Sequence, residues 1–283
     1  MLLLVIPGTA ALVVLEAPWW AEHSPPFAIW TIGLSVLLGL VAFKMRSATV
    51  SGAAAGAVIT ASLMFSTAIV PYEPWRTALI PVLALLVLTS LATRLGRAKK
   101  ERLGLAEDRH GRTASQVAAN LGFSALACSE LAQSWLADSG WFTPAAIAKG
   151  ILLAPMLAAL AEAAADTLSS EIGQVFGGRP RMITTLRRVE PGTDGAITPA
   201  GTLAGIAGAA IVAAAGAIAL RGDLTLFAIC WGSGVFGLLF DSLLGATIER
   251  RGWLNNDLVN FLSTVGAAAF AVGAMFLRSH SIT

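Results

Sequence analysis

Long apolar runs dominate the chain, and short polar segments separate them. A helix that crosses the hydrocarbon core of a membrane needs about 20 apolar residues. The runs predict seven to nine transmembrane helices in a single all-α polytopic domain covering residues 1–283, with the fifth run polar enough for a bundle-interior or partly interfacial helix. The nine candidate spans are 2–17, 26–43, 48–70, 76–93, 114–137, 142–164, 199–220, 224–246 and 257–278.

Positive charges follow every second predicted helix. Most of the 19 Lys and Arg residues come after the second, fourth, sixth or eighth span. The positive-inside rule therefore places these loops, and with nine spans the N-terminus, in the cytoplasm. We expect a multi-pass protein of a bacterial inner (plasma) membrane or an equivalent membrane, with a site formed on its cytoplasmic face by loops 94–113, 165–198 and 247–256.

Composition supports a membrane class and argues against several others. Hydrophobic residues make up 56% of the chain and charged residues 13%, whereas a soluble domain carries about 25% charged residues. The net charge of +2 gives no strong attraction to nucleic acid. The three histidines share no spacing, which argues against a His-based metal site, and no Gly-x-Ser-x-Gly motif supports a hydrolase.

Acidic and hydroxyl side chains gather at the end of the sixth predicted span. Glu162 and Asp166 are four residues apart, so they share a helix face, and Glu171 follows. Two close carboxylates in an apolar setting are tolerable if a cation lies between them or one is protonated. Mg²⁺ favours one or two carboxylates together with substrate phosphates. The group predicts a metal site, with a solvated helix end as the alternative.

A basic, glycine-rich loop follows these acids. Glycines let backbone N–H groups approach a phosphate, and arginines add charge-assisted bonds. Asp194 is open to two interpretations: a turn residue that caps the next helix, or a metal or nucleotide contact. The loop has no Walker motif. Its predicted phosphate-binding residues are Arg179, Arg181, Thr184, Thr185, Arg187, Arg188, Gly192, Thr193, Asp194 and Gly195.

Two further polar groups approach the same face. Asp241, Gly245 and Glu249 recur every four residues and line one helix face, with Ser242 beside them. An acid inside a span favours function, since ionisable groups at membrane depth are costly. Asn255, Asn256 and Asn260 follow; they are candidates to hydrogen-bond a ligand, although Asn255 and Asn256 also suit a helix cap.

The last group lies between the fourth and fifth spans. Arg112 is a candidate phosphate ligand, and Gln116 and Asn120 face one way on the helix that follows. The preceding charge run from Lys99 to Arg102 is better explained by cytoplasmic anchoring and contact with anionic lipid.

These blocks together resemble one membrane family, the domain of unknown function 92 (transmembrane protein 19-like) family, which includes plant phytyl-phosphate kinase. The resemblance covers roughly residues 30–278, and its Pro-Gly-Thr-Asp-Gly block is specific. The acidic block also faintly resembles a motif of dolichol kinases and CDP-diacylglycerol synthases. The matching segments are 116–120, 165–173, 183–195, 201–205, 241–246 and 259–260.

The family resemblance implies a kinase that converts a prenyl (phytyl or geranylgeranyl) monophosphate to the diphosphate, with CTP or another nucleoside triphosphate as donor. We expect Asp166, Glu171 and Asp241 to be catalytic and to hold Mg²⁺, with Glu162 and Glu249 as further ligands. The expected partners are the prenyl-phosphate lipid, the nucleotide and membrane lipids, and a homo-oligomer is compatible with the sequence. Two alternatives remain: a carrier or flippase of a phosphorylated lipid or anion, and a CDP-lipid-forming cytidylyltransferase.

Overall fold

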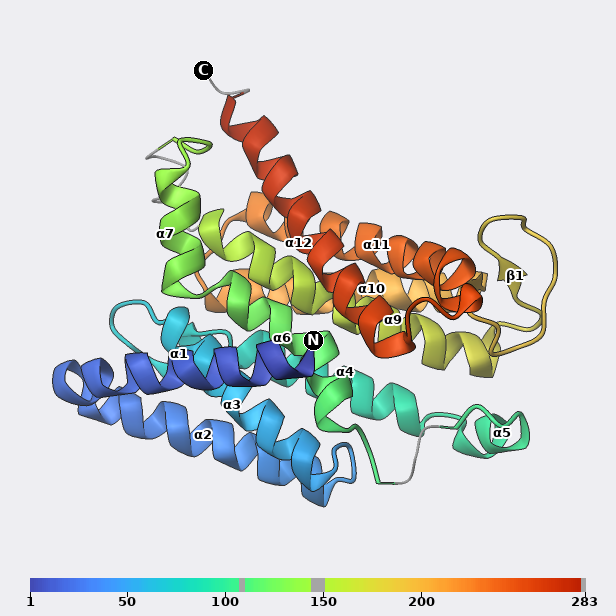
Figure 1. Cartoon of the computed structure of the whole chain (residues 1–283), viewed down its shortest axis with the longest axis horizontal. Coiled ribbons are helices and arrows are strands. Elements are labelled where there is room, and N and C mark those ends of the chain that lie inside the picture. The colour runs from blue at the N-terminus through green and yellow to red at the C-terminus, as the bar shows by residue number, and fades with distance from the viewer. Residues whose placement is uncertain (107–109, 144–150, 281–283) are drawn as a thin grey trace.

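A computed structural model describes residues 1–106, 110–143 and 151–280. Within these ranges the chain is a bundle of helices, and a long segment with two short strands connects α9 to α10 (Figure 1). Single 3₁₀ turns cover Pro74–Arg76, Ile151–Leu153 and Glu249–Arg251. The α-helices are α1 Leu2–His23, α2 Pro25–Lys44, α3 Val50–Ser66, α4 Leu79–Arg94, α5 Arg97–Arg102, α6 Ala114–Ala127, α7 Glu130–Asp138, α9 Ala154–Phe176, α10 Pro199–Ala219, α11 Leu224–Thr247 and α12 Asn256–His280.

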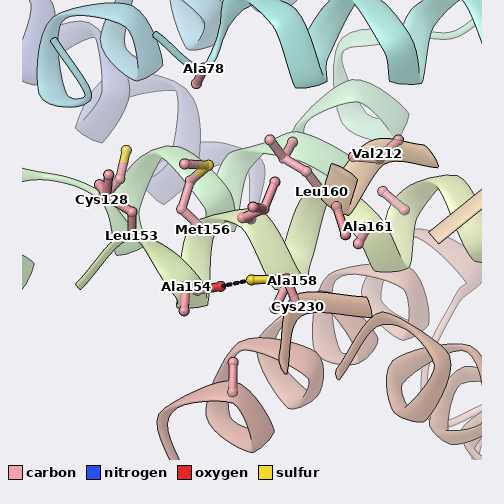
Figure 2. Packing of buried hydrophobic residues seen from close by; sticks show 14 of the residues in the cluster. Ala78, Cys128, Leu153, Ala154, Met156, Ala158, Leu160, Ala161, Val212 and Cys230 are labelled. Atoms are coloured by element: carbon pink, nitrogen blue, oxygen red, sulfur yellow. Dashed lines mark hydrogen bonds between the residues drawn. The ribbon is translucent and has the colours of Figure 1, made fainter. Parts of the chain in front are cut away.

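Helix α9 is the centre of the bundle. Its first twelve residues, 154–165, are buried without exception, and α4, α6, α10, α11 and α12 all pack against it. The helix is rich in alanine, which favours helical backbone and lets neighbouring helices approach closely. Figure 2 shows this core, in which the Cys230 thiol of α11 donates to the Ala154 carbonyl at 3.6 Å.

Helix α10 approaches the backbone of α9 through glycines. A Cβ atom at Gly205 would lie 2.7 Å from the Ala165 carbonyl oxygen, and one at Gly201 would collide with the Ser169 carbonyl. Only glycine permits this separation, so the small residues of the seventh predicted span serve helix packing. The contact fixes α10 beside the half of α9 that carries the acidic residues.

Five of the described helices are long and apolar enough to cross a membrane: α1, α2, α10, α11 with its 3₁₀ turn, and α12. Helices α3 and α4 are apolar but shorter. The fifth predicted span, 114–137, is interrupted after Cys128, where the Ser129 hydroxyl accepts a bond from the Ala132 N–H and begins α7. The serine cap offers the backbone an alternative to a continuous helix.

The boundary predicted near residue 164 is wrong. Part of the sixth span, residues 144–150, lies outside the described residues, and α9 continues to Phe176 without a break. The loop predicted over 165–198 therefore begins at Gly177. The polar residues after 164 do not end the helix because its other side, including Leu168, stays packed in the core.

The basic loops meet at one end of the bundle. The Thr49 N–H donates to the Arg112 carbonyl at 2.9 Å, joining the α2–α3 loop to the segment before α6. In Figure 1, α5 and the short strand β1 (Arg181–Met182) lie at this same end. At another loop, Asp223 caps α11 by accepting the Leu226 N–H at 2.9 Å, and this bond lowers the pKa of the Asp223 carboxyl.

Candidate functional site

A polar cavity of about 320 Å³ opens at the basic end of the bundle. Its wall comes from α6, α9, α11, α12 and the turn at 191–195, so segments far apart in the sequence contribute to one space. Of the residues predicted to form a site, those that line it are Arg112, Gln116, Asn120, Asp166, Glu171, Gly192, Thr193, Asp194, Gly195, Asp241, Ser242, Glu249 and Asn260.

Asp166 of α9 and Asp241 of α11 are the central acids of this cavity. The two carboxylates lie within electrostatic range of each other, and Arg112 is a cation within range of Asp166. The Arg112 Nη2 also donates to the Thr167 hydroxyl at 3.4 Å. Oδ2 of Asp241 is buried and has no hydrogen-bond partner among the described residues. A buried carboxylate oxygen in this state is suited to binding a cation.

Glu162 lies one helical turn before Asp166 and does not line the cavity. Its side chain is 1% exposed, and its Oε1 has no hydrogen-bond partner within the described parts of the chain. Gly237 of α11 makes room for it, since a Cβ there would collide with the Glu162 side chain. The predicted pairing of Glu162 and Asp166 on one face holds, but Glu162 sits beneath the cavity wall.

Glu171 is engaged in a buried ion pair. Its Oε2 accepts from the Lys100 Nζ at 2.5 Å and its Oε1 from the Thr93 hydroxyl at 2.9 Å. Lys100 is only 1% exposed and also donates to the carbonyls of Ala92 and Thr93. Both carboxylate oxygens of Glu171 are thus bound, which favours a structural role over the predicted catalytic one. The prediction that residues 99–102 face lipid is wrong for Lys100.

The acids predicted to bind metal do not form one protein-only metal site. No group of three or more His, Cys, Asp or Glu side chains within the described residues could hold an ion. Asp166 and Asp241 nevertheless fit Mg²⁺, which takes one or two carboxylates and completes its shell with water and phosphate oxygens. Glu249, in the 3₁₀ turn after α11, also lines the cavity.

The turn at 191–195 is locked onto α11. A Cβ at Gly195 would collide with the Ala246 backbone, and one at Gly245 would lie 2.8 Å from the Gly195 nitrogen. Gly195 also has a φ of +73°, a conformation that other residues rarely adopt. This packing explains the Pro-Gly-Thr-Asp-Gly block, because it holds the turn one helical turn beyond Asp241.

Helix caps exclude Asp194 as a cap and show Asn255 as one, whereas Asn256 lines the cavity. Helix α10 is capped by Thr198, whose hydroxyl accepts the Gly201 N–H at 3.0 Å, so Asp194 is not its cap and lies in the cavity wall. Asn255 caps α12, accepting the Leu258 N–H at 3.0 Å. Gln116 serves a capping box with Thr113 while lining the cavity.

The arginines of the glycine-rich loop lie outside the polar cavity. Strand β1 (Arg181–Met182) pairs antiparallel with β2 (Ala196–Ile197), in register Arg181 with Ile197. Met182 is 3% exposed and points inward, and strand alternation therefore turns Arg181 outward. The predicted phosphate ligands that this hairpin keeps away from the cavity are Arg179, Arg181, Thr184, Thr185, Arg187 and Arg188.

The structure adds Gln174 to the cavity wall, a residue that the sequence prediction did not include. Ser170 and Gln174 follow Asp166 at four-residue intervals and line the cavity beside it. The buried Oε1 of Gln174 has no hydrogen-bond partner in the described structure. The four-residue spacing of Asp166, Ser170 and Gln174 indicates a shared helix face. The sequence prediction did not use this spacing because its helix ended at residue 164.

Comparisons with known proteins place the chain in a family. An uncharacterised membrane protein of Methanocaldococcus jannaschii is 46% identical over 38% of this chain and 45% of its own length. An uncharacterised membrane protein of Synechocystis is 31% identical over 70% of this chain and 74% of its own.

A plant relative comes from Arabidopsis thaliana. The chloroplastic protein VTE6 is 31% identical over 64% of this chain and 54% of its own, so the chain spans about half of it. No solved structure matches the chain significantly. The model of the family described as "Integral membrane protein DUF92" matches residues 33–268. The protein therefore belongs to the DUF92 family of integral membrane proteins.

Proposed function

We propose that the protein is a kinase that transfers a phosphoryl group from a nucleoside triphosphate to a prenyl monophosphate in the polar cavity. The observation that carries the proposal is the convergence of Asp166, Asp241, Arg112 and the glycine turn on one polar space at the basic end. The chloroplastic relative VTE6 supports it through its place in a family that the sequence resemblance links to phytyl-phosphate kinase. The basic end would face the cytoplasm, where nucleoside triphosphates are found.

The reaction needs alignment and charge neutralisation more than a strong base. An oxygen of the lipid phosphate forms a bond to the γ-phosphorus of the donor. The bond from that phosphorus to the β–γ bridging oxygen breaks, which leaves a prenyl diphosphate and a nucleoside diphosphate. The attacking oxygen is already an anion, so no group has to remove its proton.

The cavity residues have separate roles in this proposal. Asp166 and Asp241 would hold Mg²⁺, which neutralises phosphate charge when bound. Arg112 would bind the acceptor phosphate, because guanidinium forms charge-assisted bonds with phosphate oxygens. The backbone of the turn at 192–195 would contact the donor phosphates, since its glycines let N–H groups come close.

The test is a product assay on detergent-purified protein. Wild-type protein would be incubated with Mg²⁺, each of the four labelled nucleoside triphosphates, and geranylgeranyl or phytyl monophosphate. We expect a prenyl diphosphate and the matching nucleoside diphosphate, and their loss with EDTA. Arg187→Ala serves as a control variant. Arg187 is exposed and lies outside the cavity, so this variant should form the same products as wild type.

The products also separate the alternatives. A CDP-linked lipid with released pyrophosphate would establish a cytidylyltransferase in place of the kinase. Absence of any product from folded protein, together with movement of a labelled prenyl phosphate across vesicle membranes, would establish a carrier.

A further inference from the structure

A second and larger cavity, of about 560 Å³, lies beside the polar one. It fills the space between α2, α3, α4 and α6, where the consecutive helices α3 and α4 make little contact with each other. Its walls along most of its length are apolar or small, with Leu38, Gly56, Val82, Leu85 and Leu121 among them. Small-molecule sites fall in a range of about 300–1,000 Å³, so the cavity is large enough for a ligand.

The cavity is elongated along the helices and changes character along its length. On α4 its lining runs from Val82 to Arg94, twelve steps along the helix that span about 18 Å at about 1.5 Å per step. The end at Val82 and Thr60 is buried, with exposed fractions of 3% and 1%. The opposite end carries Arg94 and Arg97. An apolar depth below a charged mouth suits a molecule with a hydrocarbon chain and an anionic head.

The two cavities share a wall. Arg112, Gln116 and Asn120 line both of them, and no other described residue does. Arg112 is fixed there by its backbone, which bonds to the α2–α3 loop through the Ser47 carbonyl at 3.1 Å. A phosphate beside Arg112 would therefore stand at the boundary, with the acids on one side and the apolar space on the other.

We propose that this apolar cavity binds the hydrocarbon chain of the prenyl monophosphate, with the phosphate held at the boundary by Arg112. The assignment of the head group rests on the proposed function. The hydrocarbon chain is assigned to this cavity because the apolar walls favour burial of a hydrocarbon.

Gly56 sets the width of the cavity one helical turn below its entrance. A Cβ at Gly56 would meet only Val117 Cγ1, at 3.8 Å, which is ordinary contact. Gly39 differs, since a Cβ there would lie 2.7 Å from the Ala53 carbonyl, and Gly52 abuts the Arg112 backbone. A larger side chain at Gly56 should therefore narrow the cavity without pushing the helices apart, whereas one at Gly39 or Gly52 would collide with backbone.

The test measures binding, independently of turnover. Geranylgeranyl monophosphate and the one-isoprene dimethylallyl monophosphate would be titrated onto wild type, Gly56→Leu and the matched control Gly56→Ala. We expect Gly56→Leu to lose at least tenfold in affinity for the long chain and less than twofold for the short one. Gly56→Ala should resemble wild type. Leu86→Trp narrows the opposite wall and replaces Gly56→Leu if that variant does not fold.

A photoactivatable group at the far end of the chain gives a second readout. In wild type it should label peptides from 50–66 and 79–94, and this labelling should disappear in Gly56→Leu. Unchanged long-chain affinity in both narrowing variants, labelling only on lipid-facing surfaces, or equal competition by phosphatidylglycerol would each overturn the proposal. Long-chain binding in the cavity without any diphosphate product would support the binding site and contradict the proposed kinase activity.

Discussion

At the residue scale, Asp166 and Asp241 differ from the other carboxylates because they are the two proposed to hold Mg²⁺. Replacement of Asp241 by Asn keeps the shape of the side chain but removes the charge, and the Oδ2 of Asp241 is buried with no hydrogen-bond partner among the described residues. If it holds Mg²⁺, this change should lower kcat at least about a hundredfold, since metal ions contribute several kcal/mol to such reactions. Asp166→Asn should behave alike.

The measurement is the product assay at saturating substrates, with the melting temperature in detergent as a check on folding. A folded Asp241→Asn protein with full activity would remove Asp241 from the mechanism. Higher Mg²⁺ should partly rescue either variant, which a purely structural defect would not show.

The buried Lys100–Glu171 pair leads to a prediction about stability. Lys100→Met leaves the Glu171 carboxylate in a buried site without its cation, which costs about 3–5 kcal/mol in comparable cases. The double variant Lys100→Met/Glu171→Gln removes that charge and should recover much of the loss. Thermal unfolding in detergent of both single variants and the double variant measures the coupling. Additive losses would show that the pair does not couple α5 to α9.

At the element scale, the contact between the glycine turn and α11 links packing to the site. Gly195→Ala should both strain the backbone at positive φ and push the turn away from Ala246. Gly104→Ala is the control, because Gly104 also has positive φ, +71°, but open space around it. Each should lose stability of about 1 kcal/mol from strain.

Only Gly195→Ala should also raise the KM for the nucleotide, because only this change displaces a wall of the polar cavity. Initial rates over a nucleotide series would measure the difference. Equal KM values in the two variants would show that the turn does not contact the donor.

The elements also show how far sequence pattern reaches. Seven of the nine apolar runs each correspond to one described helix, and the four-residue spacing of Asp241, Gly245 and Glu249 predicted one face of α11 and of the 3₁₀ turn after it, which lines the cavity. The end of α9 lies beyond the predicted boundary. The polar side chains after residue 164 indicate a loop in an apolar chain, but a helix tolerates them where they face a cavity. The hairpin arginines were misplaced because composition carries no information about which way a strand turns its side chains.

At the scale of the whole molecule, the sequence predicted that four polar groups would meet, and three of them together with part of the basic loop line one cavity. The apolar cavity was not predictable in this way. It depends on where α3 and α4 separate, and helix spacing results from contacts between segments far apart in the chain. Small residues such as Gly56 look the same in a sequence whether they serve close packing or leave space.

Orientation across the membrane is a prediction of the whole chain and is open to direct measurement. The positive-inside rule places Lys44 and Arg187 in the cytoplasm and Asp138 on the opposite side. Figure 1 agrees with the relative placement, since α7 and β1 lie toward opposite ends of the bundle. The natural cysteines, Cys128 and Cys230, are fully buried, so single introduced cysteines can be labelled over a low background.

Lys44→Cys, Arg187→Cys and Asp138→Cys place thiols at three exposed positions. An impermeant maleimide added to intact cells should label only Asp138→Cys, and it should label the other two only after the membrane is opened. The reverse pattern would put the polar cavity on the face without nucleoside triphosphates, and the proposed donor would then be unavailable to it. Labelling of Lys44→Cys and Arg187→Cys from different sides would instead show that the number of crossings between them is odd, against the four that the apolar runs predict.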